Sequence, residues 1–151
     1  MRFFLDTEFN GFGGELMSIA LVPEYGTREY YAVLPPPEHM HPWVERHVVP
    51  YLDSVPTGLK TERLPAGVIA REIARFLADE EERVIVADWP DDIAYFCRLL
   101  MTGPGEMVTI GSLAFTLVDL AGFSTARNSK VPHNALHDAR ALRDFVLETE
   151  S

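Results

Sequence analysis

The chain has 151 residues, 47% of them apolar, and a formal net charge of −10 at pH 7. This length and composition predict a single globular domain over residues 1–151. No run reaches the ~20 apolar residues that a membrane helix needs, and acids interrupt any apolar secretory signal at the N-terminus. We therefore expect a cytoplasmic protein without membrane contact. The negative charge argues against a broad basic face for nucleic acid and favours a short footprint, with phosphates held through metal ions.

The first nine residues predict a buried strand that carries two carboxylates near its end. Side chains two apart in a strand point to the same face, so Asp6 and Glu8 project together, in line with Phe4. Two anions about 7 Å apart at the rim of an apolar core repel each other unless a cation lies between them. A divalent cation is the natural candidate. The alternative is that the strand ends at Asp6 and both acids are solvated turn residues.

Two further strands are expected in the first part of the chain. Residues 15–22 are apolar, and residues 28–34 are rich in aromatic and branched side chains. Short turns separate these segments from the first strand and from each other. The three strands therefore predict an antiparallel meander.

A histidine-containing loop follows the meander. Residues 43–52 predict a short helix that Pro50 breaks or bends. His39, His41 and His47 lie in or near this helix, but no cysteine or matched ligand spacing accompanies them. We therefore expect surface histidines rather than a zinc site.

The middle of the chain predicts a helix, a buried strand and a second helix. Pro65 suits the first position of a helix with a regular apolar face. Residues 84–87 form an unbroken apolar run, typical of a strand buried on both faces. The second helix runs to about Met101. Cys97, the only cysteine, excludes an intrachain disulfide and is expected to be buried on the apolar stripe of that helix.

Three aspartates lie between this strand and the second helix. Asp88 is suited to cap the helix, and Asp91 shares a face with Tyr95 that we expect to be solvated. Asp92 stands one turn before Phe96, at the edge of the buried stripe. Asp92 is therefore the candidate for chemistry, with Asp88 as the alternative.

The last part of the chain predicts a strand within residues 113–120 and a helix from His133 to about Glu148. Asp138 shares a helix face with Leu142. A carboxylate on an apolar stripe is unfavourable unless it is paired or binds a metal. His133 precedes Asp138 by five residues and is free to reach over the same site.

Four acids and one histidine therefore come from three separate segments. The acids could hold two divalent ions ~4 Å apart, as in phosphoryl transfer from polynucleotides. Mg²⁺ or Mn²⁺ suits all-oxygen ligands better than zinc does. A histidine of near-neutral pKa could deprotonate the attacking water. The candidate residues are Asp6, Glu8, Asp92 and Asp138 as metal ligands, with His133 as the base.

Three segments resemble the exonuclease motifs of the DEDDh 3′-to-5′ exonucleases: D-T-E-F from Asp6, D-I-A-Y-F from Asp92, and H-N-A-L-H-D from His133. The resemblance implies a single exonuclease domain with an α/β, RNase H-like fold. That fold is a mixed sheet of three antiparallel strands and then parallel strands, flanked by helices. The resemblance also implies that the four acids bind two metals and that His133 is the general base.

A closer resemblance concerns residues 28–33 and 43–50, which look like the small bacterial and phage RNase T-like 3′ exoribonucleases. It implies a two-metal-ion exoribonuclease that releases nucleoside 5′-monophosphates from the 3′ end of single-stranded RNA. In the second motif, the H-N that usually precedes the aspartate is replaced by residues 88–90. This departure is the reason for keeping Asp88 as the alternative ligand.

Phe9, Asn10 and Trp89 are the expected substrate contacts. Phe9 and Trp89 could stack on the terminal base, and core packing is the alternative for both. RNA over DNA rests on the resemblance alone, so a proofreading or repair DNA exonuclease is the second hypothesis. An inactive binding module is the third. The sequence leaves a homodimer open.

Overall fold

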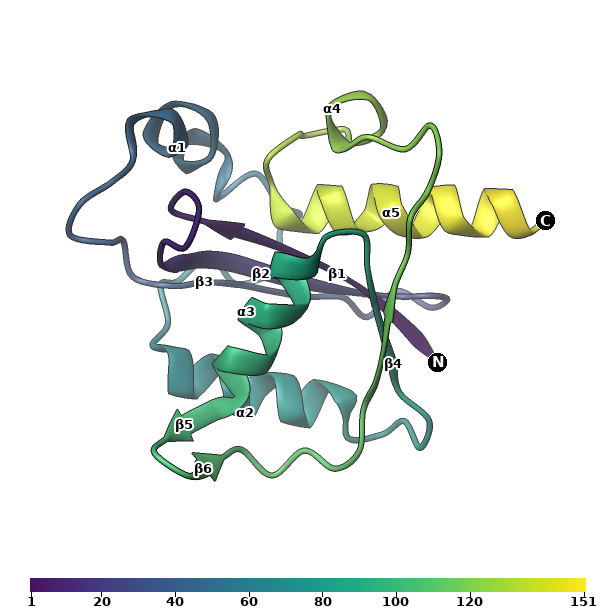
Figure 1. Ribbon diagram of the computed structural model, residues 1–151, viewed down its shortest axis with the longest axis horizontal. Coiled ribbons are helices and arrows are strands. Elements are labelled where there is room, and N and C mark those ends of the chain that lie inside the picture. The colour runs from purple at the N-terminus through teal and green to yellow at the C-terminus, as the bar shows by residue number, and fades with distance from the viewer.

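A mixed five-stranded sheet in the order β3-β2-β1-β4-β7 forms the centre of the computed structural model, which describes residues 1–151 (Figure 1). Strands β1, β2 and β3 are antiparallel, whereas β4 runs parallel to β1, and β7 runs parallel to β4. The expected meander followed by parallel strands is therefore confirmed. The strands are β1 (Arg2–Phe9), β2 (Leu16–Pro23), β3 (Tyr30–Val33), β4 (Val84–Ala87) and β7 (Ala114–Leu117).

Helices cover both faces of this sheet, and a small hairpin lies beyond α3. Figure 1 shows α5 on one side of the sheet and α2 and α3 on the other. No helix combines the length and the apolar character needed to cross a membrane. The remaining elements are α1 (Pro42–His47), the 3₁₀ helix η1 (Val49–Tyr51), α2 (Ala66–Leu77), α3 (Pro90–Leu100), β5 (Met101–Gly103), β6 (Glu106–Met107), α4 (Thr125–Asn128) and α5 (Ala135–Glu150).

Strand β1 lies in the middle of the sheet, so its alternating side chains are buried on both faces. Phe3 and Leu5 pack into a cluster with α2 and α3, whereas Phe4 packs against Leu142 of α5. Asp6 follows Phe4 on the α5 side by the same alternation. The acids of β1 therefore follow residues that are packed on both faces of the sheet, and this packing fixes the position of the strand.

The rotation of α3 about its axis differs from the prediction. Tyr95 is buried and Cys97 is exposed, the reverse of what the apolar stripe predicted. Tyr95 is held inside because its ring stacks on Phe9 and its hydroxyl donates to the carbonyl of Gly14. Asp92, on the same side of the helix, bonds to β1. These contacts of Tyr95 and Asp92 stabilise the observed rotation of α3 by more than burial of the small Cys97 thiol would stabilise the predicted one.

Candidate metal centre

Asp6 and Glu8 extend from the end of β1, and the strand continues to Phe9. The alternative in which the strand ends at Asp6 is therefore wrong. The two side chains project with Phe4 toward α5, and the Asp6 Oδ2 atom is buried without a hydrogen-bond partner. Thr7, between them, points to the opposite face.

Thr7 of β1 fixes the orientation of the Asp92 carboxylate. The backbone N–H of Thr7 and its hydroxyl both donate to Asp92 Oδ1, at 3.1 and 2.6 Å. The carboxylate lies in the first turn of α3, where the helix macrodipole favours negative charge, and is only 3% exposed. Asp92 is thus oriented before any ligand binds.

Asp88 does not cap α3, which corrects the prediction from the sequence. The capping position is Trp89, because Pro90 occupies the first helical position, and no side chain bonds to the helix start. Asp88 instead lies at the carboxyl end of β4. Parallel pairing of Phe4 with Val86 brings this end level with Asp6, since each acid is two residues beyond the paired position.

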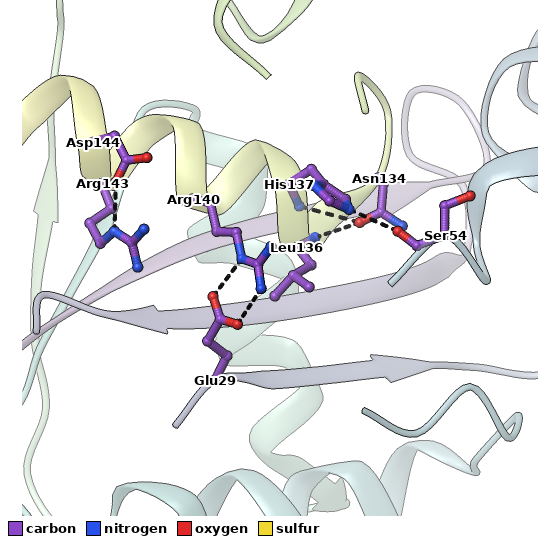
Figure 2. Close-up of polar contacts among 8 residues, drawn as sticks. All are labelled: Glu29, Ser54, Asn134, Leu136, His137, Arg140, Arg143 and Asp144. Atoms are coloured by element: carbon purple, nitrogen blue, oxygen red, sulfur yellow. Dashed lines mark hydrogen bonds and ion pairs between the residues drawn. The ribbon is translucent and has the colours of Figure 1, made fainter. Parts of the chain in front are cut away.

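Asp138 is placed by the start of α5. Asn134 caps this helix, and its Oδ1 accepts from the backbone N–H groups of Leu136 and His137 at 3.0 and 3.3 Å (Figure 2). Asp138, one turn into the helix and 3% exposed, accepts a 3.1 Å hydrogen bond from the backbone N–H of His133. Its other oxygen, Oδ1, is buried without a partner.

Five carboxylates converge where these elements meet, in two groups that share Asp6. Within each group, one oxygen from every member lies within 4.8 Å of the others. These acids are close enough to hold a metal ion. The first group is Asp6, Glu8 and Asp138, and the second is Asp6, Asp88 and Asp92.

The chain supplies no positive partner to the acids of this centre. None of the five acids takes part in an ion pair with lysine, arginine or histidine. Burial, followed by repulsion from neighbouring carboxylates, raises the pKa of Asp6 and Glu8 well above their usual values. Burial likewise raises the pKa of Asp92 to about 7 and that of Asp138 to about 6. Unpaired oxygens in an all-carboxylate site suit a hard divalent cation.

His133 lies beside the acids, since its backbone N–H bonds to Asp138. Its backbone is in the left-handed region, with φ at 69°. The ring packs edge-on against Trp43, with 5.0 Å between ring centroids, and lies 6.5 Å from His47. Burial, with a smaller effect of His47, lowers the pKa of the His133 imidazole. This shift favours the neutral form of the ring, which can accept a proton.

His133 and Glu8 line one cleft of about 450 Å³ beside the acids. Much of its wall is aromatic, and several of these rings face solvent. Trp89 is 59% exposed, so the core-packing alternative is wrong for this residue. The sequence interpretation missed Phe12, which is 97% exposed, and Trp43, which is 47% exposed. Phe12 lies in the glycine-rich turn after β1, and Trp43 lies in the first turn of α1, directly after Pro42.

Phe9 and Asn10, the other two expected substrate contacts, both make contacts within the protein. The Phe9 ring stacks on Tyr95 at 4.7 Å between centroids, and its edge lines the cleft. The Asn10 amide accepts from the N–H of His41 at 2.7 Å and donates to the carbonyl of His39 at 2.6 Å. Asn10 thus ties the turn after β1 to the loop before α1, and its amide is already occupied.

No protein-family model matches this chain, and a search of curated proteins finds no match. The chemistry of the centre is therefore inferred from its own residues and their geometry.

Proposed function

We propose that the protein is a two-metal-ion 3′-to-5′ exoribonuclease of the RNase H-like DEDDh type. It would release nucleoside 5′-monophosphates from the 3′ end of single-stranded RNA. The observation that supports this most strongly is that Asp6 belongs to both carboxylate groups. Two neighbouring cation positions joined by a shared acid suit in-line displacement at a phosphodiester. The mixed sheet of three antiparallel and then parallel strands is compatible with that fold.

The ligands divide between two positions for Mg²⁺ or Mn²⁺. Asp6, Glu8 and Asp138 would hold one cation, and Asp6, Asp88 and Asp92 the other, so Asp88 joins the four acids expected from the sequence. Bound there, the cations would polarise the scissile phosphodiester and lower the pKa of the attacking water. The buried, unpartnered oxygens of Asp6 and Asp138 favour this assignment.

His133 would act as the general base. Its neutral ring would take the proton of the attacking water, and the open side of the cleft would let that proton leave to solvent. The hydrogen bond from its backbone to Asp138 couples the histidine to the acid centre. Trp43 limits the orientations of the ring by packing against one side of it.

The aromatic cleft would hold the terminal nucleoside. Its volume of about 450 Å³ is within the range of small-ligand sites. Stacking on an aromatic ring tolerates any base, because every base has a π-face. Exposed Trp89 and Phe12 are the candidates for that stacking, which fits trimming of ends rather than reading of sequence.

Matched RNA and DNA strands of one sequence, labelled at the 5′ end, test the proposal with Mg²⁺ or Mn²⁺. We expect a ladder shortened from the 3′ end, release of 5′-monophosphates, and no products in EDTA. Faster cleavage of the DNA strand than of the RNA strand would instead favour the second hypothesis, a proofreading or repair DNA exonuclease. Failure to cut either strand with any divalent metal, or cutting in excess EDTA, would refute a two-metal exonuclease.

A further inference from the structure

A second concave surface lies on α5, away from the face that carries Asp138. It encloses about 530 Å³ between α5, the turn from β2 to β3, and the segment after α4. We call it the α5 groove and define it by Lys130, Arg140 and Arg143 with the acids Glu29 and Asp144. Unlike the aromatic cleft, it has a single hydrophobic lining residue.

Both carboxylate oxygens of Glu29 and one of Asp144 already accept hydrogen bonds within the α5 groove. Arg140 donates from Nε and Nη2 to the two Glu29 oxygens, at 2.7 and 2.6 Å (Figure 2). Arg143 donates from Nε to one oxygen of Asp144 at 2.8 Å, and the other oxygen belongs to an exposed side chain. The acids therefore orient the arginines more than they compete for a ligand.

Several donors of the groove remain free. Arg143 keeps both terminal nitrogens, Arg140 keeps Nη1, and Lys130 has no ion pair. Three cations stand against two carboxylates, which leaves this surface positive on a chain of net charge −10. A guanidinium fork and an ammonium are the donors that phosphate oxygens prefer.

We propose that the α5 groove binds phosphodiester groups of the nucleic-acid strand whose 3′ end occupies the acid centre, an inference that rests on the proposed function. The segment before α5 and α5 itself contribute residues both to the α5 groove and to the acid centre. Lys130 precedes His133 by three residues, and Arg143 follows Asp138 by five, about 7.5 Å along the helix. The same two segments therefore carry residues of both places, although no acid of the centre lines the groove. The groove supplies, over a short footprint, the positive charge that the acidic surface elsewhere lacks.

Equilibrium binding of RNA tests this without catalysis. Fluorescence anisotropy of a 5′-labelled octamer and of a 5′-labelled dinucleotide is measured in Mg²⁺ on proteins that also carry Asp92→Asn. Asp6, Glu8 and Asp138 can then still hold a cation at the 3′ end, and no strand is cut. The test protein carries Lys130→Ala with Arg143→Gln, which leaves the Arg140–Glu29 pair intact. The control is Arg71→Gln with Arg75→Gln, which removes the same number of positive charges at exposed positions of α2, across the sheet from α5.

We expect the double variant to bind the octamer about tenfold more weakly than the control does, and to lose most of the preference for the octamer over the dinucleotide. The slope of log affinity against log salt should fall by about 0.7 for each phosphate that the protein no longer binds. Octamer affinity equal to that of the control would overturn the proposal. An equal loss of affinity for both lengths would overturn the upstream placement, because only the longer strand can reach along the groove.

Cleavage of the octamer in Mg²⁺ separates this inference from the proposed function. If the wild type cuts the strand while the double variant binds as the control does, only the groove assignment is wrong. If no protein cuts any strand, the exonuclease proposal fails, and the anisotropy still decides whether the groove holds a nucleic acid.

Discussion

Asp6 of β1 lies beside Asp88, which follows the carboxyl end of the parallel strand β4, and each acid is two residues beyond the paired Phe4 and Val86. This pairing joins the two carboxylate groups into one centre. An acid at the end of a parallel strand points toward the edge where ligands bind in α/β sheets. Asp88 is therefore a member of the candidate site rather than the helix cap that its position in the sequence suggested.

Replacing Asp88 by Asn tests this assignment. The change removes one repulsive charge without disturbing a helix cap, so we expect the metal-free protein to unfold at an equal or higher temperature. Turnover should fall about tenfold or more, because the second cation position has one ligand fewer. Asp119→Asn, at an exposed position, is the matched control and should alter neither. Asp88→Ala, which cannot cap a helix, should keep the stability of wild type as well; a loss of about 1 kcal/mol in that variant with full activity would restore the capping role.

Replacing Asp92 by Asn should abolish turnover and leave stability equal or higher. The amide oxygen of the Asp92→Asn side chain could still accept the two hydrogen bonds from Thr7, while the buried charge disappears. Single-turnover cleavage and thermal unfolding in EDTA measure the two effects. A folded Asp92→Asn protein that cleaves RNA at the wild-type rate would remove this residue from the site.

The metal-free protein should lose stability as the pH rises from about 4 to about 7. The pKa of Asp92 is raised to about 7 and that of Asp138 to about 6. In this window the folded protein therefore holds protons that the unfolded chain has released, and each pH step favours unfolding. His133, whose pKa is lowered, acts in the opposite direction. Because His133 is present in both proteins, comparing wild type with Asp92→Asn isolates the carboxylate.

Melting temperatures in EDTA at about pH 5 and about pH 7.5 provide the measurement. The drop between the two should be smaller in Asp92→Asn than in wild type. An equal drop in both proteins would show that Asp92 is ionised throughout and that its burial has no energetic consequence.

Mg²⁺ should raise the melting temperature of the wild type and have little effect on Asp6→Asn. A ligand that binds only the folded state stabilises it by about 2.7 kcal/mol at a hundred times its dissociation constant. Asp6 belongs to both groups, so its loss should weaken both positions, whereas Glu8→Gln should weaken one. Equal metal stabilisation of wild type and Asp6→Asn would contradict the shared ligand. Far-UV circular dichroism in EDTA should remain that of a folded protein.

Local periodicity was enough to predict most of this centre. Asp6 and Glu8 share a face because strand side chains alternate, and Asp138 lies on an apolar helix stripe. These patterns depend only on neighbours in the chain. The meander, the buried β4 and the approximate helix bounds follow from the same kind of pattern.

The features that differ from the prediction depend on contacts between residues that are far apart in the sequence. Asp88 reaches the centre through the register of β1 with β4, which no local pattern records. The rotation of α3 is set by contacts of Asp92 with Thr7 and of Tyr95 with Phe9, so Cys97 turns outward. The aromatic cleft likewise forms only in the folded chain, because Phe12, Trp43 and Trp89 come from the turn after β1, from α1 and from the start of α3.

His133 should carry the general-base step, and its backbone decides which substitution can test it. At φ 69° alanine is unfavourable by about 1–2 kcal/mol, whereas asparagine tolerates the left-handed region. His133→Asn keeps the backbone N–H that bonds to Asp138 but cannot accept a proton. We expect folding and metal binding close to those of wild type, with the single-turnover rate reduced about 10²–10⁴-fold.

The matched control is His137→Asn, at the residue that directly precedes Asp138 in α5 but belongs to neither carboxylate group. His137 bonds through Nε2 to the carbonyl of Ser54 at 2.8 Å (Figure 2), so its replacement should lower stability by about 1 kcal/mol and leave the chemical step intact. Both variants are compared on a short 5′-labelled RNA from about pH 5 to about pH 9. The wild-type rate should fall as the pH drops through the pKa of His133, which burial places below its usual value. His133→Asn should lose that dependence. Wild-type rates in His133→Asn, or inactivity confined to His137→Asn, would assign the base to another residue.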